Sequence, residues 1–336
     1  MKASFEKYLL EFKRPSGTSR GVLKKKSTYF ITIDKGKNKA IGEAALFRGL
    51  SADDVPEYET KLQEVCDHIE KYQDNFHEEL RDFPSIVFGL EQAFLKLKNA
   101  SGYCFENSFT EGSKGIPMNG LIWMGDQNFM HDQIEAKLAD GYSCLKLKIG
   151  AIDFEKEMDL LSELRKRFTT DKLEIRVDAN GAFLPHEALA KLARLAALDL
   201  HSIEQPIRAG QVSEMAELCK ETPLAIALDE ELIGVQSIVS KRNLLARISP
   251  QYIILKPALV GGFLACDGWI KLAEEMNIGW WITSALESNL GLEAIAEYTA
   301  SKNTNMYQGL GTGQLFTNNL TSKLEIRDAK LWMSQS

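Results

Sequence analysis

The chain has 336 residues, a length that favours two domains, or one barrel with an addition, over a single small domain. A net charge of −7 and a pI near 5.5 argue against non-specific nucleic-acid binding and against binding to an anionic membrane surface. Five scattered cysteines without a C-x-x-C pair argue against a disulfide framework or a zinc site. With no signal-peptide core and no apolar run of about 18 residues, we expect a cytoplasmic protein.

Residues 1–114 are predicted to form an α+β domain. Alternating apolar residues predict strands, and apolar residues at helical spacing predict helices. These are strands over Ser27–Ile33 and Lys37–Ala44 and helices over Ala52–Lys71 and Ser85–Asn99. Residues 12–26 contain Pro15, two glycines and many basic and hydroxyl residues, so they are predicted to be a mobile loop, with Lys24-Lys25-Lys26 in solvent.

Residues 115–316 are predicted to form a β/α barrel. Short apolar runs predict eight strands, over Met118–Trp123, Cys144–Ile149, Leu173–Val177, Ser202–Glu204, Leu224–Leu228, Tyr252–Leu255, Trp280–Thr283 and Met306–Gly309. Helical periodicity appears between them, over Phe154–Phe168, His186–Ala197, Val212–Cys219, Gly262–Met276 and Leu290–Ala300. Alternating strands and helices indicate a parallel sheet, and eight repeats in about 200 residues suit a closed (β/α)8-type barrel.

The tail of residues 317–336 lies beyond the last predicted barrel strand. It contains two further short apolar segments, Lys323–Ile326 and Ala329–Met333. We expect this tail to fold back and complete the N-terminal domain.

Charged residues stand at the C-terminal ends of the predicted barrel strands. Lys148, Asp178, Glu204, Asp229 and Lys256 are separated by 30, 26, 25 and 27 residues, each about one strand–helix unit. Parallel barrel strands end at one rim, where barrel enzymes place their active sites. Charged groups attached to apolar strands are rarely buried unless they are paired or bind a metal ion. Five such residues in register therefore predict a catalytic site.

The residue types indicate which chemistry this rim supports. Three carboxylates on neighbouring strands form a hard oxygen site that suits Mg²⁺. A substrate carboxylate beside such an ion would be stabilised as its α-proton leaves and an enediolate forms. The flanking lysines lie near a cation and near each other, which disfavours their ammonium form, so one of them is expected to act as a base.

Five motifs carry a resemblance to a known family. They are KLKIG at 146–150, VDANG at 177–181, IEQP at 203–206, LDEEL at 228–232 and ILKPALVGG at 254–262. This ordered set resembles the enolase superfamily, in the branch related to muconate lactonizing enzyme. PSIVFGLEQAF at 84–94 is similar to the helix that ends the N-terminal capping domain of that branch. The resemblance implies a modified (β/α)7β barrel with an α+β capping domain.

The resemblance also implies roles for the residues at the rim. Asp178, Glu204 and Asp229 would bind Mg²⁺, with Mn²⁺ as an alternative ion. Lys148 would be the acid/base, and Lys256 would face it across a small carboxylate substrate. The resemblance further implies that Lys146 lies beside Lys148 and lowers its pKa, and that Asn180 supports the site by hydrogen bonding.

Three further segments are similar to the o-succinylbenzoate synthase family of this branch. They are KRPSGTSRGVLKKK at 13–26, SALESNLGL at 284–292 and GLGTGQLF at 309–316. This similarity implies a Mg²⁺-dependent syn-dehydration of 2-succinyl-6-hydroxy-2,4-cyclohexadiene-1-carboxylate to 2-succinylbenzoate, a step of menaquinone biosynthesis. Arg20, Asn180, Ser284, Gly311 and Thr312 would then lie at the substrate.

Several alternatives remain open from the sequence. A dipeptide epimerase or N-acylamino acid racemase would use Lys148 and Lys256 as bases on opposite faces of the substrate, and a non-catalytic scaffold is a third hypothesis. Glu230 and Glu231 compete with Asp229 as the third ligand, although strand alternation favours Asp229. Lys146 fits a solvated strand end as well as a site residue, and the sequence does not distinguish a monomer from a homo-oligomer.

Overall fold

Three antiparallel strands open the chain in the computed structural model, which describes residues 1–18, 21–302 and 304–335. They pair in the order β1-β2-β3, with β1 at Lys2–Thr18, β2 at Gly21–Lys35 and β3 at Asn38–Ala44. The two strands predicted in this region are confirmed, as parts of β2 and β3. Alternate β2 residues Tyr29, Ile31 and Ile33 are fully buried, which gives the sheet one apolar face.

The loop predicted over residues 12–26 is wrong, because most of that segment belongs to the long hairpin of β1 and β2. The pairing register shifts between Glu11 and Ser16, and this irregularity contains Pro15, which has no N–H for the ladder. Lys24 and Lys25 are exposed, as predicted for the basic run. Lys26, however, is buried, so the interpretation of the whole run as solvated is corrected.

Among the described residues four helices follow this sheet: α1 at Tyr58–Asp67, α2 at Ile69–Tyr72, α3 at Phe76–Glu79 and α4 at Pro84–Lys98, of which α1 and α4 pack on its strands. The first predicted helix begins later than expected, at Tyr58, because Pro56 disfavours a helical conformation in the residue before it. Pro84 occupies the first turn of α4, as expected. A Cβ on Gly42 of β3 would lie 1.9 Å from the carbonyl oxygen of Gly89 on α4. Both elements therefore pack at a distance that glycine alone permits.

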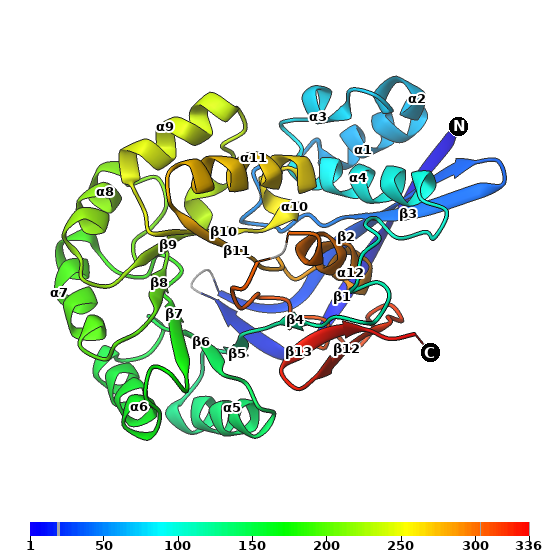
Figure 1. Cartoon of the computed structure of the whole chain (residues 1–336). Coiled ribbons are helices and arrows are strands. Elements are labelled where there is room, and N and C mark those ends of the chain that lie inside the picture. The colour runs from blue at the N-terminus through cyan, green and yellow to red at the C-terminus, as the bar shows by residue number, and fades with distance from the viewer. Residues whose placement is uncertain (19–20, 303, 336) are drawn as a thin grey trace.

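A parallel sheet with helices outside it forms the middle of the chain (Figure 1). Among the described residues it has seven strands in sequential order: β5 Gly120–Ile122, β6 Cys144–Lys148, β7 Glu174–Asp178, β8 Ser202–Glu204, β9 Ile226–Leu228, β10 Tyr252–Leu255 and β11 Gly279–Ile282. The helices are α5 Gln127–Ala139, α6 Phe154–Arg167, α7 Pro185–Ala196, α8 Val212–Glu221, α9 Ile238–Ile248, α10 Pro257–Val260, α11 Gly262–Glu275 and α12 Asn289–Ala300, with a 3₁₀ turn η1 at Glu230–Leu232. Every helix predicted here from periodicity is confirmed.

The eighth predicted strand, over Met306–Gly309, closes the barrel without forming a regular ladder. Gln308 forms a parallel bridge to Met118, and Gly309 forms one to Thr283. The side-chain carbonyl of Gln308 also accepts a hydrogen bond from the Ile282 N–H at 2.8 Å, in place of a main-chain acceptor. A Cβ on Gly309 would lie 2.1 Å from Thr283 Oγ1, so this closure requires glycine.

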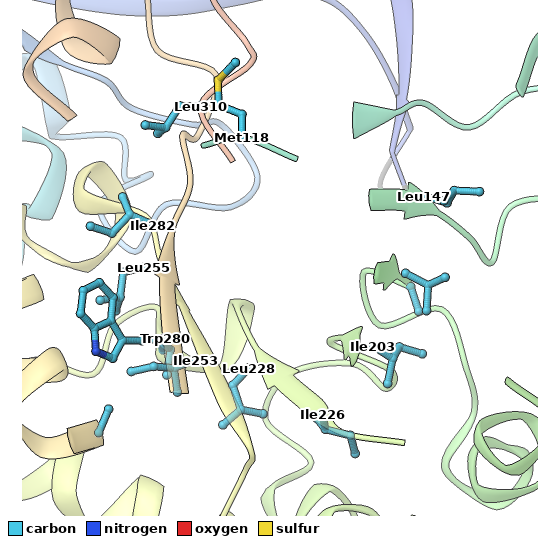
Figure 2. Close-up of a cluster of buried hydrophobic side chains, with 14 of the residues drawn as sticks. Met118, Leu147, Ile203, Ile226, Leu228, Ile253, Leu255, Trp280, Ile282 and Leu310 are labelled. Carbon is cyan, nitrogen blue, oxygen red and sulfur yellow. The ribbon is translucent and has the colours of Figure 1, made fainter. Parts of the chain in front are cut away.

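Side chains alternate across the barrel wall. Figure 2 shows a set of apolar residues from successive strands, and these belong to the core that the strands share with the surrounding helices: Leu147, Ile203, Ile226, Leu228, Ile253, Leu255, Trp280 and Ile282. Because neighbouring residues on a strand point to opposite faces, the residues between and after them face the barrel interior. A second, smaller cluster of Ala227, Ile254 and Trp281 lies there. The same alternation directs the charged residues at the strand ends inward.

The end of the chain folds back onto earlier segments. Phe316 bridges Phe12 of β1, and the Thr317 N–H donates to the Glu11 carbonyl at 2.8 Å. Strands β12 (Leu324–Arg327) and β13 (Lys330–Met333) then form a hairpin, and β13 pairs with β4 (Ile116–Pro117). All five cysteines are buried free thiols. Within the described ranges, no helix is both long and apolar enough to cross a membrane.

Glu297 of α12 provides a test of the packing between the barrel and residues 100–105. It is buried and accepts hydrogen bonds from the N–H groups of Cys104 (2.6 Å) and Phe105 (3.2 Å). Burial raises the pKa of Glu297 to about 7. The folded state thus holds the proton of the Glu297 carboxyl more tightly than the unfolded chain does. The resulting contribution to the free energy of unfolding is complete below about pH 4.5 and is lost as pH rises through about 7.

Glu297→Gln is expected to remove this pH-dependent loss. The difference in unfolding free energy between variant and wild type should shift in favour of the variant by on the order of 1–3 kcal/mol between pH 5 and pH 8. Urea unfolding at both pH values measures it, with Glu214→Gln on the surface of α8 as the control. An equal difference at the two pH values would contradict the assignment.

Candidate active site

The charged strand-end residues predicted from their spacing meet at one rim of the barrel. In the ladders of the three adjacent strands β6, β7 and β8, Lys148 lies opposite Asp178, and Asp178 lies opposite Glu204. Asp229 directly follows β9 and Lys256 directly follows β10. The three carboxylates are at most 2 % exposed, so their charges must be compensated locally.

Lysine ammonium groups compensate these carboxylates. Lys146 Nζ lies 3.0 Å from Asp178 Oδ2 and also forms an ion pair with Glu204. Lys148 Nζ lies 2.9 Å from the same Asp178 oxygen. On the other side, Lys256 forms an ion pair with Asp229 and lies 3.9 Å from Glu204 Oε1. Lys146 is therefore a buried member of the site and not a solvated strand end.

The electrostatics of the site follow from burial and from these contacts. Burial disfavours the ammonium form of Lys146, but the attraction of Asp178 and Glu204 is greater, so the pKa of Lys146 is raised. The pKa of Lys256 is raised for the same reason, chiefly by Asp229 against the effect of burial. For Lys146 and Lys256 the direction is therefore opposite to the lowering of lysine pKa values expected from the sequence.

Glu204 differs from its two acidic neighbours. Burial, together with repulsion from Asp178 and Asp229, raises the pKa of Glu204 well above its usual value. For Asp178 and Asp229 burial acts in the same direction, but the nearby lysines outweigh it and their pKa values are lowered. At Glu204, burial and the two neighbouring carboxylates thus outweigh the attraction of Lys146 and Lys256.

A cavity adjoins these groups, and parts of it come from the N-terminal domain. Lys146, Lys148 and Lys256 border it together with Asn180, Ser284, Gly311 and Thr312, all of which were predicted site residues. Ser284 Oγ and Thr312 Oγ1 are 2.5 Å apart. Apolar walls are added by Phe47 and Leu50, which follow β3, and by Trp123, which follows β5. Arg20, the remaining predicted substrate residue, lies outside the described residues.

Comparison with known proteins now places this site in a family. The sequence profile of the family described as enolase C-terminal domain-like matches residues 130–335. The chain is also 48 % identical to an o-succinylbenzoate synthase of Desulfotalea psychrophila, over 99 % of both sequences. The chain belongs to the enolase superfamily. Superfamily members generally use a divalent metal ion, usually Mg²⁺.

Solved structures agree with this assignment. The crystal structure of MenC from Desulfotalea psychrophila superposes with a TM-score of 0.87 at 45 % identity, covering 99 % of each chain. The L-Ala-D/L-Glu epimerase of Bacillus subtilis superposes with a TM-score of 0.84, covering 99 % of this chain and 96 % of that one, but at 19 % identity it supports the fold alone. The predicted (β/α)7β barrel with an α+β capping domain is confirmed. The boundary predicted at residue 114 stays a prediction.

The residues at the rim fit a superfamily metal ion, although they are not gathered as a finished metal site. Within the described ranges, no three acidic, cysteine or histidine side chains already form a metal-binding group. The ammonium groups of Lys146 and Lys256 contact the carboxylates instead. Neither Glu204 oxygen has a hydrogen-bond partner among the described residues, although Lys146 is in ion-pair contact with one of them. Buried carboxylate oxygens that lack hydrogen-bond donors and lie beside two further carboxylates suit a hard divalent cation.

Gln205 is a site residue that the sequence reasoning missed. Its side-chain carbonyl accepts from the N–H groups of Asp229 (3.1 Å) and Glu231 (3.3 Å), and its amide donates to the Glu231 carboxylate at 3.2 Å. The backbone of Gln205 has a positive φ of 40°, a conformation that non-glycine residues rarely adopt. Gln205 therefore fixes the segment after β9 and ties Glu231 to a structural role. The sequence feature that could have identified Gln205 is its position in the IEQP motif at 203–206.

Proposed function

We propose that this chain dehydrates 2-succinyl-6-hydroxy-2,4-cyclohexadiene-1-carboxylate to 2-succinylbenzoate, as an o-succinylbenzoate synthase of menaquinone biosynthesis. The observation that carries the proposal is 48 % identity to a protein of that name over 99 % of both chains. The rim supports it independently, because Lys148 and Lys256 stand on either side of three buried carboxylates at a cavity with apolar walls.

Lys148 is the acid/base in this proposal. As the neutral amine, its Nζ takes the proton from the ring carbon that bears the carboxylate. The resulting ammonium returns that proton to the departing hydroxyl on the same face, so water leaves and Lys148 is restored. Asp178, Glu204 and Asp229 would hold a divalent cation, which would supply positive charge to stabilise the substrate carboxylate.

Lys256 remains an ammonium throughout. Its contact with Asp229 favours the charged form, which is consistent with its raised pKa. From there it stabilises the negative charge that develops on the substrate. Phe47, Leu50 and Trp123 form apolar walls that exclude water and suit a six-membered ring.

The reaction is tested by following the decrease in absorbance as the cyclohexadiene substrate is consumed. Purified protein is expected to convert the cyclohexadiene substrate to 2-succinylbenzoate, to lose this activity in EDTA and to regain it with Mg²⁺. Absence of conversion by folded, Mg²⁺-loaded protein would refute the proposal. Activity that survives EDTA would refute its metal requirement.

The alternative of an epimerase or racemase rests on the two lysines that flank the site. If both act as bases, solvent deuterium should enter the α-position of a dipeptide or an N-acylamino acid at a rate similar to that of dehydration. We expect such exchange to be much slower than dehydration of the cyclohexadiene. Exchange without any dehydration would select the alternative.

A further inference from the structure

Asn180 lies between Lys148, the proposed acid/base, and the carboxylate of Glu230. Its side-chain oxygen accepts a hydrogen bond from Lys148 Nζ at 2.6 Å, and its amide nitrogen donates to Glu230 Oε1 at 3.2 Å. Its backbone N–H donates to Asp178 Oδ1 at 3.0 Å. A positive φ of 45° places Asn180 in the left-handed region, where asparagine is tolerated better than most residues. The backbone is thus fixed, and the side chain joins two charged groups.

The charges at the two ends decide which way the amide faces. An ammonium group can only donate and a carboxylate can only accept, so the amide oxygen must face Lys148 and the amide nitrogen must face Glu230. If the Glu230 carboxylate were absent, only the Lys148 ammonium would favour this orientation, and a neutral Lys148 amine, which can also accept a hydrogen bond, would no longer impose it. A rotated amide would present N–H groups to the ammonium and would release it. Glu230 therefore specifies the acceptor that holds Lys148.

Glu230 does not reach the substrate cavity itself. Asn180 borders both that cavity and a second groove, which Glu230 lines together with Gly150, Gly181 and Arg208. Glu230 therefore lies on the far side of Asn180 from Lys148. The Asn180 amide therefore links the Glu230 carboxylate to Lys148 Nζ through two hydrogen bonds.

We propose that Glu230 is a positioning residue for Lys148 and acts through the side chain of Asn180. This inference rests on the proposed function and extends it, because it gives a role to an acidic residue that the sequence alone leaves as a competing metal ligand. The Glu230–Asn180–Lys148 chain aims the amine at the substrate. Asp229, directly before Glu230, remains the proposed ligand.

The proposal is tested by exchanging the acid and the amide between positions 180 and 230, with substitutions that change the side-chain shape very little. Asn180→Asp places a carboxylate opposite Glu230, and Glu230→Gln removes the charge that orients the amide. Each single variant is expected to lower kcat about tenfold or more, with KM and Mg²⁺ affinity changed less than about twofold. The double variant keeps one donor and one acceptor in reversed order, so it should recover most of the lost kcat. Glu217→Gln, on the exposed face of α8, is the charge-matched control.

Different experimental results would contradict the coupling of Glu230 to Lys148, the role of Glu230, or the proposed function. A double variant no better than the product of the single effects would overturn the coupling, and so would full kcat in Glu230→Gln. A large loss of Mg²⁺ affinity in Glu230→Gln would make Glu230 a ligand instead. If wild type does not dehydrate the cyclohexadiene, the proposed function fails separately. Crystal structures of wild type and Glu230→Gln then decide the inference, because it requires the Asn180 amide and Lys148 Nζ to shift in the variant, and an unmoved Nζ overturns it.

Discussion

Asp178→Asn is expected to lower kcat by on the order of a thousandfold or more while leaving the protein folded. Asp178 is fully buried, and both Lys146 and Lys148 contact its carboxylate. Asparagine has nearly the same shape but no charge. The substitution therefore removes a proposed metal ligand and the counter-ion of two lysines in one step. Two separate requirements of the reaction are lost together.

Three measurements separate these effects from unfolding. Dehydration kinetics report kcat, calorimetric titration with Mg²⁺ reports the loss of ion affinity, and circular dichroism reports the fold. Asp159→Asn, at an exposed position of α6, is the matched control and should behave as wild type. Activity within tenfold of wild type in Asp178→Asn would rule out the proposed arrangement of the metal and the lysines.

Lys148→Met should lower kcat by about 10²- to 10⁴-fold, the range expected when a general acid/base is removed. Lys148 lies 2.9 Å from Asp178 and 2.6 Å from Asn180, so it is held in one place beside the cavity. Methionine keeps much of the side-chain volume but cannot carry a proton. Because Lys148 is not a proposed ligand, Mg²⁺ affinity should be retained or increased.

Lys256→Met provides the comparison that identifies the base. It should also lower kcat, because a positive charge is lost beside the substrate. However, slow exchange of the substrate α-proton with solvent should persist in Lys256→Met and be absent in Lys148→Met. The opposite pattern would exchange the roles of the two lysines. Exchange lost equally in both variants would indicate that neither acts as the sole base.

The barrel and its charged rim could be predicted from the sequence because each depends on local regularity. Strand alternation directs Lys148, Asp178 and Glu204 inward, and the spacing of about one strand–helix unit places them at one rim. These two rules need no knowledge of distant contacts. They also identified Lys256 and Asp229, since each follows a short apolar strand directly.

Features that depend on distant contacts were missed or misread. Residues 12–26 have the composition of a loop, yet most of the described ones belong to a long hairpin, because main-chain hydrogen bonds do not depend on side-chain type. Lys26 is buried because other parts of the chain pack over that strand, which its basic neighbours do not indicate. The roles of Gln205 and Glu230 depend on contacts between residues that follow different strands of the barrel. No periodicity encodes these contacts.

A crystal structure with Mg²⁺ and 2-succinylbenzoate bound would test the central claim most directly. We predict one ion bound by Asp178, Glu204 and Asp229, with Lys146 and Lys256 no longer in ion-pair contact with Glu204 and Asp229, and with Lys148 facing the ring of the product. An ion bound elsewhere, with the lysines still paired to these carboxylates, would contradict the account.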